Sequence, residues 1–410
     1  MTPALAQQFC SVRRQSELLC APLTPEDMMV QSCAEASPAK WHLAHTTWFF
    51  ETFILRELDP DYKPFHPDFL WLFNSYYNSV SEQPEKKLRA SFSRPGVDEI
   101  RAYRTHVDAA LQRWLKAGVP EEIEQRVILG LHHEQQHQEL LLTDMKHAFW
   151  TNPLRPAYLA LPFKEQSIET VELEWREHAG GLAEIGHRGE GFCFDNELPR
   201  HRAYLEPFDL ASRLVTCAEY LAFIEDGGYQ RADLWLSEGW QTVQAEGWHA
   251  PLYWQQDKTS GERSVFTLRG EVPLSELAQT PVCHVSYFEA DAFAHWAGKR
   301  LPTEAEWEVT ASEEDVSGNL LEDGVLHPVA AGGTQMFGDV WEWTASAYLG
   351  YPGFHALPGA LGEYNGKFMS NQMVLRGGSC VTPKTHIRAS YRNFFSPATR
   401  WQFSGIRLAR

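Results

Sequence analysis

The stretch LHHEQQHQELLLTDMKH, residues 131–147, indicates which fold the first part of the chain adopts. Its apolar residues recur three and four positions apart, which is the period of an amphipathic α-helix. The same period runs from Pro120, a residue that favours a helix start, to about residue 149. Three other stretches share it, near residues 3–20, 38–57 and 97–117. Because four amphipathic helices bury their apolar faces most simply against one another, we predict a four-helix bundle over residues 1–155.

The remainder of the chain follows a different pattern. After several prolines between residues 153 and 162, it consists of short β-prone runs with many Gly and Trp residues and few helical stretches. This composition is typical of a domain that mixes helices and strands with much irregular structure. We therefore expect a domain boundary between residues 150 and 175, followed by an α+β domain over residues 170–410.

The charge balance argues against two classes of partner. The chain has 36 Lys and Arg residues against 54 Asp and Glu residues, which gives a formal net charge of −18. Such a protein repels nucleic-acid phosphates and anionic membrane surfaces. The sequence shows no signal-peptide pattern at its start and no apolar run long enough to span a bilayer. We expect a soluble, cytoplasmic protein that binds neither nucleic acid nor membranes.

The seven cysteines, at positions 10, 20, 33, 193, 217, 283 and 380, form no CxxC pair. An odd number of scattered cysteines indicates neither a disulfide framework nor a thiolate zinc site. We interpret most of them as buried, reduced thiols.

Two histidines in the opening stretch have the spacing of metal ligands. His133 and His137 lie four residues apart, so a helix places both on one face with their Cβ atoms about 5–6 Å apart. Gly130, Leu140 and Leu141 lie near the same stripe, which turns the pair toward the interior of the bundle. A spaced pair by itself is a weak signal, because a histidine-bearing helix face is often simply solvated.

The predicted helix near residues 38–57 offers a third ligand. In SPAKWHLAHTTWFFETF, residues 37–53, His45 shares a face with Trp41, Trp48 and Thr52. An unpaired imidazole is costly in such an apolar setting, so a metal ion is one explanation for it. His42 and His132 compete for this role, but each is turned by about 100° or more from the inward stripe of its helix. We interpret those two as residues that support the ligands or lie on the surface.

The glutamates of the same stretch allow two further readings. Glu134 and Glu139 could each orient a ligand imidazole through its second ring nitrogen, or be solvated charges. HEQQH, residues 133–137, also fits the HExxH pattern of zinc proteases, with Glu134 as general base. A protease would place this helix against an edge strand, whereas here it belongs to an all-helical half.

Two family resemblances cover nearly the whole chain. One histidine from the second helix and an HxxxH pair from the fourth resemble the DinB-like metal-binding bundle. The second half resembles the formylglycine-generating enzymes, a C-type-lectin-like α+β fold. This likeness rests on PVCHVSYFEADAFAHWAGKRLPTEAEWE (281–308), FGDVWEWTAS (337–346), LRGGSC (375–380) and GIRLAR (405–410). In this order, the two halves together resemble the ergothioneine-biosynthesis sulfoxide synthases.

The likeness to the formylglycine-generating enzymes concerns fold and not chemistry. Those enzymes use two cysteines shortly after the RGGS block, whereas Cys380 is followed by VTPKTHIRASYRN, which has no second cysteine. Copper-dependent formylglycine formation is therefore disfavoured, and we interpret Cys380 as a core thiol.

The resemblance to the sulfoxide synthases implies a metal, substrates and a reaction. It places Fe(II) on His45, His133 and His137, the three residues that helix geometry also favours. Three neutral imidazoles leave open positions on one side of the metal, a variant of the facial arrangement in non-haem iron oxygenases. The implied reaction uses dioxygen to join the imidazole C2 of N-α-trimethylhistidine (hercynine) to the sulfur of cysteine or γ-glutamylcysteine, and oxidises that sulfur to a sulfoxide.

The resemblance also implies residues that act on the substrates. Tyr76 and Tyr77, in FNSYYNSV, look like the paired tyrosines of the cysteine-using branch, in which one donates a proton. Without the family context, two packing tyrosines in a loop are an equal alternative. Arg89 and Arg94 are the candidates for binding the thiol substrate's carboxylate, and the sequence does not choose between them.

The trimethylammonium group of the other substrate donates no hydrogen bond, so aromatic faces suit it. Asn393, Phe394 and Phe395 match the block that closes over the iron in the family, although Phe394 and Phe395 are also consistent with core packing. Gln136 lies between the two iron-binding histidines and is placed to hydrogen-bond substrate. We expect the active site in the cleft between the two domains.

Two other functions remain consistent with the residues alone. One is a DinB-like metal-dependent thiol transferase or hydrolase that uses zinc or nickel, since histidine ligands suit several metals. The other is a binding protein in which a metal ion only holds the helices together and has no catalytic role. Oxygen consumption with substrates distinguishes the first from a sulfoxide synthase, and a mere binder has no need of open metal positions.

Overall fold

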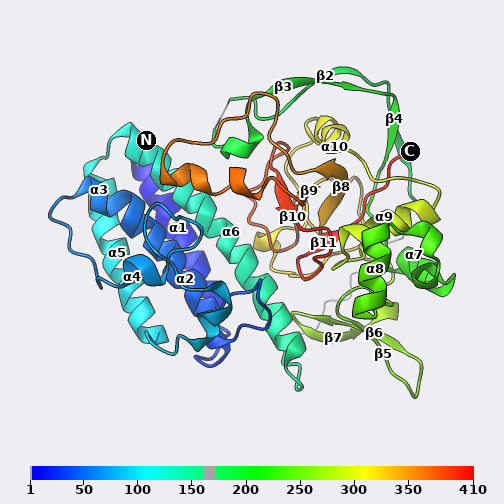
Figure 1. Cartoon of the computed structure of the whole chain (residues 1–410), viewed down its shortest axis with the longest axis horizontal. Coiled ribbons are helices and arrows are strands. Elements are labelled where there is room, and N and C mark those ends of the chain that lie inside the picture. Colours follow the sequence, from blue (N-terminus) through cyan, green and yellow to red (C-terminus); the bar gives the residue numbers. More distant parts are fainter. Residues whose placement is uncertain (1, 161–170, 190) are drawn as a thin grey trace. The chain divides into compact units, whose positions relative to one another are not determined.

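The computed structural model describes residues 2–160, 171–189 and 191–410 (Figure 1). The chain forms two compact units. The first consists of residues 1–158 together with residues 357–364, and the second of residues 159–356 and 365–410. Much of the boundary expected between residues 150 and 175 lies outside the described residues, which omit 161–170. The return of residues 357–364 to the first unit is not visible in the sequence pattern.

The first unit is a helical bundle, which confirms the predicted fold class. Its long helices are α1 (Thr2–Cys20), α2 (Ala39–Phe50), α5 (Val97–Ala117) and α6 (Glu121–Thr151). Shorter pieces are α3 (Arg56–Leu58), α4 (Phe69–Leu72), and the 3-10 turns η1 (Asp27–Met29) and η3 (Lys86–Ser91). Both α2 and α6 begin directly after a proline, Pro38 and Pro120, as the sequence predicts.

Helix α2 lies at the centre of the bundle. Every one of its residues is buried, whereas α5 buries mainly one side and α6 is buried all round only in parts of its length. A helix that is buried all round needs neighbours on all sides, and α2 packs against both α5 and α6, while α1 packs against the same two helices. The chain continues from α2 through a π-helical turn, η2 (Glu51–Leu55), a distortion that recurs at functional sites.

The second unit combines small sheets with short helices, as predicted. Its largest sheet has the strand order β10-β9-β8-β11, in which only the β11–β8 pair is parallel. These strands are β8 (Trp341–Ala347), β9 (Met373–Arg376), β10 (Asn393–Phe395) and β11 (Ser404–Gly405). A three-stranded antiparallel sheet contains β5 (Trp254–Gln256), β6 (Arg263–Thr267) and β7 (Gly270–Pro273). Two antiparallel pairs join β1 (Trp175–His178) to β4 (Phe208–Ala211) and β2 (Gly181–Ile185) to β3 (His201–Leu205).

The helices of the second unit begin at strong local signals. They are α7 (Cys217–Glu225), α8 (Ser237–Glu246), α9 (Tyr287–Trp296) and α10 (Glu304–Ala311). In the LPTEAEWE motif, the Thr303 hydroxyl accepts from the Glu306 amide, and the Glu306 carboxylate accepts in return from the Thr303 amide. This reciprocal capping fixes the start of α10 and directs the fully buried Trp307 to donate to Glu342 on β8 at 2.7 Å.

Two further expectations concern cysteines and membranes. All seven cysteines are free, and Cys380 is fully buried. Among the described residues, no helix is both long enough and apolar enough to cross a membrane.

Candidate metal centre

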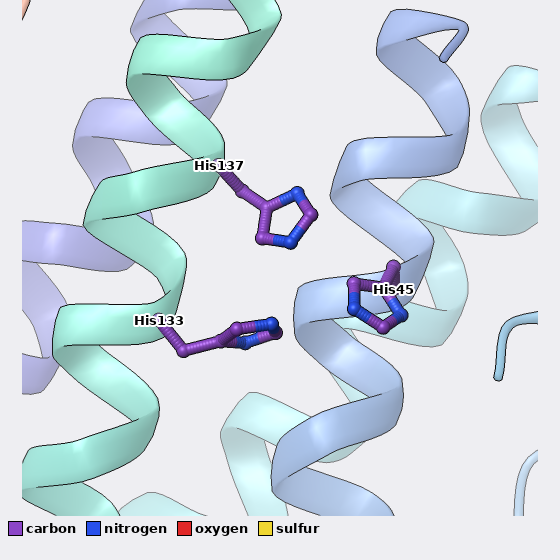
Figure 2. A group of neighbouring side chains, drawn as sticks. All are labelled: His45, His133 and His137. Atoms are coloured by element: carbon purple, nitrogen blue, oxygen red, sulfur yellow. The ribbon is translucent and has the colours of Figure 1, made fainter. Parts of the chain in front are cut away.

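Three histidine side chains meet between α2 and α6. Figure 2 shows His133 and His137 projecting from α6 toward α2, which carries His45. The three ring centroids lie 4.7 to 5.0 Å apart, and one nitrogen from each ring lies within 4.8 Å of the others. Three imidazole nitrogens gathered in this way could hold one metal ion. The structure thus places together the three residues that the sequence singled out.

His45 is held in a fixed orientation by its neighbours. Its ring stacks on Trp41 at 4.5 Å and on Trp48 at 5.5 Å, one turn of α2 before and after it. Its Nδ1 donates to the carbonyl oxygen of Phe73 at 2.7 Å. Because a neutral imidazole carries one proton, this hydrogen bond leaves the lone pair on Nε2 for a metal ion.

A second polar chain orients His137. Asp144, two turns further along α6, accepts from Nε2 of His42 at 3.1 Å and from the backbone amide of Ser37 at 2.8 Å. The Nδ1 of His42 lies 2.8 Å from Nδ1 of His137. If Nε2 of a neutral His42 donates to the carboxylate, its Nδ1 accepts, and His137 is then the donor in that contact. This assignment leaves Nε2 of His137 as the ligand atom.

The electrostatic setting keeps the three imidazoles neutral. Burial lowers the pKa of His133 to about 4. Burial, followed by the charge of His133, also holds the pKa values of His45 and His137 well below the usual value. The Nδ1 of His133 is buried and forms no hydrogen bond with any described residue. Neutral, converging imidazoles, one with a buried nitrogen lacking a partner, fit a divalent metal ion of the iron to zinc series.

Glu134 does not perform either of the roles considered for it. It is fully buried and turned away from the histidines, toward α1 and α5. Its carboxylate accepts from Arg13 at 2.8 Å, from Arg104 at 2.9 Å and from Ser16 at 2.6 Å. Burial works against ionisation, but the two guanidinium groups outweigh it and lower the pKa of Glu134 to about 2. A carboxylate that is paired with two arginines neither orients a ligand imidazole nor acts as a general base. The interpretation of HEQQH as a zinc-protease motif is therefore wrong.

The tyrosine pair lies on the loop that follows α4. Tyr77 is buried, with its ring 5.6 Å from Trp48, which also stacks on His45, and 5.1 Å from Phe53. Burial raises the pKa of Tyr77. Tyr76 is half-buried and has a positive φ of 70°. The catalytic roles of both residues stay predictions.

The structure separates the two candidate arginines. Arg89 is buried, and its guanidinium lies 3.5 Å from the ring centre of Trp41, the residue that stacks on His45. It donates to the hydroxyls of Ser37 and Ser75, and no carboxylate of the described residues forms a salt bridge with it. Burial accordingly lowers its pKa to about 10. Arg94 is exposed.

The remaining predicted substrate residues lie on α6 and β10. Gln136 is half-buried on α6. Asn393, Phe394 and Phe395 form β10 in the second unit, where Phe394 stacks on Tyr348 at 4.1 Å and Phe395 lies 5.4 Å from Trp401. These contacts give both phenylalanines a packing role, and their contribution to substrate binding stays a prediction.

Comparisons with known proteins place the chain in a family. The family model described as "Sulfatase-modifying factor enzyme 1-like domain" matches residues 178–323 and 323–410. The hercynine oxygenase of Mycobacterium tuberculosis is 32% identical over 402 residues, which are 91% of this chain and 91% of that protein. The hercynine oxygenase of Mycolicibacterium smegmatis is 32% identical over 408 residues, with the same coverage of both chains. This chain belongs to the hercynine oxygenase family.

Membership in the hercynine oxygenase family extends over both units. The formylglycine-generating enzyme of Streptomyces coelicolor, by contrast, is 29% identical over 302 residues and corresponds to 60% of this chain. The resemblance inferred from sequence motifs is therefore confirmed for the hercynine oxygenases as a whole-chain likeness.

Sequence reasoning missed one part of the metal centre. The motifs do not single out Asp144, and helix geometry allows His42 either a supporting or a surface position. A usable signal was present, because Asp144 follows His137 by seven residues and therefore lies on the same face of α6, two turns away. His132 is buried, so a surface position is wrong for it.

Proposed function

We propose that this chain is an oxygen-dependent non-haem iron(II) sulfoxide synthase of ergothioneine biosynthesis. It would form a carbon–sulfur bond between the imidazole C2 of hercynine and cysteine or γ-glutamylcysteine, with oxidation of the sulfur. The observation that supports this most directly is the convergence of His45, His133 and His137 in a member of the hercynine oxygenase family.

The reaction is balanced by one molecule of dioxygen. Joining C2–H to S–H removes two electrons and two protons, and oxidising the sulfur removes two more electrons. Dioxygen accepts all four, with one oxygen atom retained in the sulfoxide and the other leaving as water with the two protons. When bound, Fe(II) would supply the redox chemistry that dioxygen requires and a positive charge that favours the thiolate.

The side chains of this protein would hold the reactants and supply protons. The Tyr77 phenol is protonated at neutral pH, so its hydroxyl can serve as the proton donor for the oxygen atom that leaves as water. Arg89 is a buried cation without a salt bridge to any described carboxylate, next to the Trp41–His45 stack. A substrate carboxylate would satisfy its charge.

Metal binding is tested with single ligand substitutions. His133→Ala and His137→Ala are expected to lose iron, measured by metal analysis of purified protein, while circular dichroism shows that they remain folded. His106→Ala removes an exposed histidine from α5 of the same unit and should retain iron. Full activity in a metal-free His137→Ala protein would rule out the proposal.

Turnover is tested aerobically with hercynine and Fe(II), comparing cysteine with γ-glutamylcysteine by product mass. One dioxygen should be consumed for each sulfoxide formed. A thiol transferase using zinc or nickel would form product without consuming oxygen, and a binding protein would form none.

The arginine assignment is tested with a matched pair. Arg89→Lys keeps the charge but loses the planar fork that binds a carboxylate with two hydrogen bonds. We expect it to raise the KM for the thiol about tenfold, in line with the loss of one charge-assisted hydrogen bond. Arg94→Lys should leave this KM unchanged. Equal KM values for the two variants would remove the role assigned to Arg89.

A further inference from the structure

A short segment from the second half of the sequence forms part of the first unit. Residues 357–364 belong to the compact unit that contains the bundle, although more than 200 residues separate them from α6. The segment ends in a 3-10 turn, η9 (Ala360–Glu363), which begins after Gly359 with a φ of 72°. A Cβ atom at Gly362 would overlap the carbonyl oxygen of Leu357, so the turn needs glycine there.

Glu363, at the end of this turn, binds the loop that carries the tyrosine pair. Its Oε2 accepts from the backbone amide of Asn78 at 2.9 Å, and its Oε1 accepts from the backbone amide of Ser79 at 3.1 Å. Its Oε1 also accepts from the Ser79 hydroxyl. A carboxylate that accepts two consecutive backbone amides fixes the path of that backbone, because each bond is charge-assisted and directional.

Tyr364 extends the contact to the tyrosines themselves. Its ring lies edge-on to Tyr76, with centroids 6.2 Å apart. Tyr77, which directly precedes the two anchored amides, has its pKa raised first by burial and then by the nearby Tyr364 and Glu363. The segment therefore touches one tyrosine and acts electrostatically on the other.

The loop needs such support because its conformation is unfavourable. Tyr76 has a φ of 70°, a region that bulky L-residues rarely adopt. On one side, the side chain of Gln83 accepts from the Tyr76 amide at 2.8 Å and donates to the Asn78 side chain at 2.6 Å. Glu363 binds the next part of the loop, through the backbone amides of Asn78 and Ser79. Strained backbone of this kind persists only where surrounding contacts enforce it.

We propose that Glu363 is a positioning residue for the reaction, which fixes the strained loop that carries Tyr76 and Tyr77 by binding the backbone amides of Asn78 and Ser79. This inference rests on the proposed function, in which Tyr77 donates a proton. In this proposal, Glu363 acts on the reaction through the loop that it binds.

The test uses full-length, iron-loaded Glu363→Gln protein. Glutamine keeps the shape of the side chain but has one acceptor oxygen, so it cannot accept from both amides as the carboxylate does. Amide hydrogen exchange is measured for residues 74–81, and sulfoxide formation from hercynine and cysteine is measured in parallel. Glu322→Gln is the matched control, because both oxygens of Glu322 accept from the backbone amide of Lys384 on the surface of the second unit.

We expect Glu363→Gln to speed exchange at Asn78 and Ser79 about tenfold, as for the loss of one charge-assisted hydrogen bond. The kcat for the sulfoxide should fall about tenfold with the KM for cysteine unchanged, since the loop positions a proton donor. In a Tyr77→Phe background, Glu363→Gln should have no further effect on kcat, because a residue that acts only through Tyr77 is silent once its hydroxyl is gone. Glu322→Gln should change none of these quantities.

These measurements distinguish a failure of the role given to Glu363 from a failure of the proposed function. Unchanged exchange at Asn78 and Ser79 would show that Glu363 does not hold the loop. Faster exchange with an unchanged kcat, or an equal further loss in the Tyr77→Phe background, would show that the held loop does not serve the reaction. If the unmodified protein makes no sulfoxide, the proposed function fails, and with it the catalytic part of this inference, while the exchange measurement still decides the structural part.

Discussion

His42 and Asp144 support the orientation of His137, one of the three candidate metal ligands. The chain from Asp144 through His42 to Nδ1 of His137 leaves the lone pair of His137 on Nε2. Losing such a supporting hydrogen bond typically weakens metal binding 10- to 100-fold, so we expect a loss of about that size in His42→Ala. Competition with an iron(II) chelator measures it, and His106→Ala serves as the surface control. Equal iron affinity in both variants would contradict the role given to His42.

Asp339 gives the second unit a distinct dependence on pH. Burial outweighs its hydrogen bonds from Asn319, Gln335 and the Val329 amide and raises its pKa from 3.8 to about 6. Between these pH values the unfolded chain releases a proton that the folded chain retains. The contribution of Asp339 to the unfolding free energy is therefore complete below pH 3.8 and is lost as the pH rises to about 6. The loss corresponds to about 3 kcal/mol.

Asp339→Asn should lack this loss of stability. Asparagine also suits the φ of 58° at this position. The Oε1 of Gln335 has no partner among the described residues. If the Gln335 side-chain amide flips, this oxygen accepts a hydrogen bond from the side-chain NH2 group that the substitution introduces. The unfolding free energies of both proteins are measured by urea denaturation at pH 3.5 and pH 7.5. Relative to the unsubstituted protein, the variant should gain about 3 kcal/mol of unfolding free energy over this range. A difference that does not vary with pH would contradict the assignment.

At the scale of elements, the ion cluster around Glu134 joins three helices. Arg13 on α1 and Arg104 on α5 both pair with this carboxylate from α6, and Arg13 also pairs with Asp108 on α5 at 2.8 Å. Removing one partner leaves buried charges without compensation, which typically costs about 3–5 kcal/mol. We therefore expect Glu134→Ala to lower the unfolding free energy of the bundle by about this amount, followed by circular dichroism, yet to bind iron when folded. Glu121→Gln, at the exposed start of α6, should have little effect.

The sequence predicts the helices of the bundle well because their signals are local. A three-to-four residue apolar period, with prolines before two of the starts, locates α1, α2, α5 and α6 to within a few residues. The direction of Glu134 was not predictable in the same way. The helix period shows that it is turned away from His133, but its partners, Arg13 and Arg104, are on other helices and are known only once the helices pack.

At the scale of the whole molecule, the site combines residues with very different degrees of predictability. His45, His133 and His137 follow from spacing and from family motifs. Glu363 does not, because 285 residues separate it from Asn78 and no local pattern marks a carboxylate that binds two backbone amides. Contacts of this length depend on the path of the whole chain, so they become visible only in the structure.

Iron should stabilise one unit selectively. The three histidines join α2 to α6 inside the bundle, so an ion bound there is lost when the bundle unfolds. Free iron(II) at 100 times its dissociation constant adds about 2.7 kcal/mol, which raises the Tm of a domain of this size by roughly 5–10 °C. Anaerobic calorimetry should show this shift in the transition that accompanies loss of the helical signal, and His133→Ala should abolish it. Asp339→Asn, whose substitution lies in the second unit, should retain the iron-dependent shift in full. A shift that persists in His133→Ala would place the stabilising iron outside the histidine cluster.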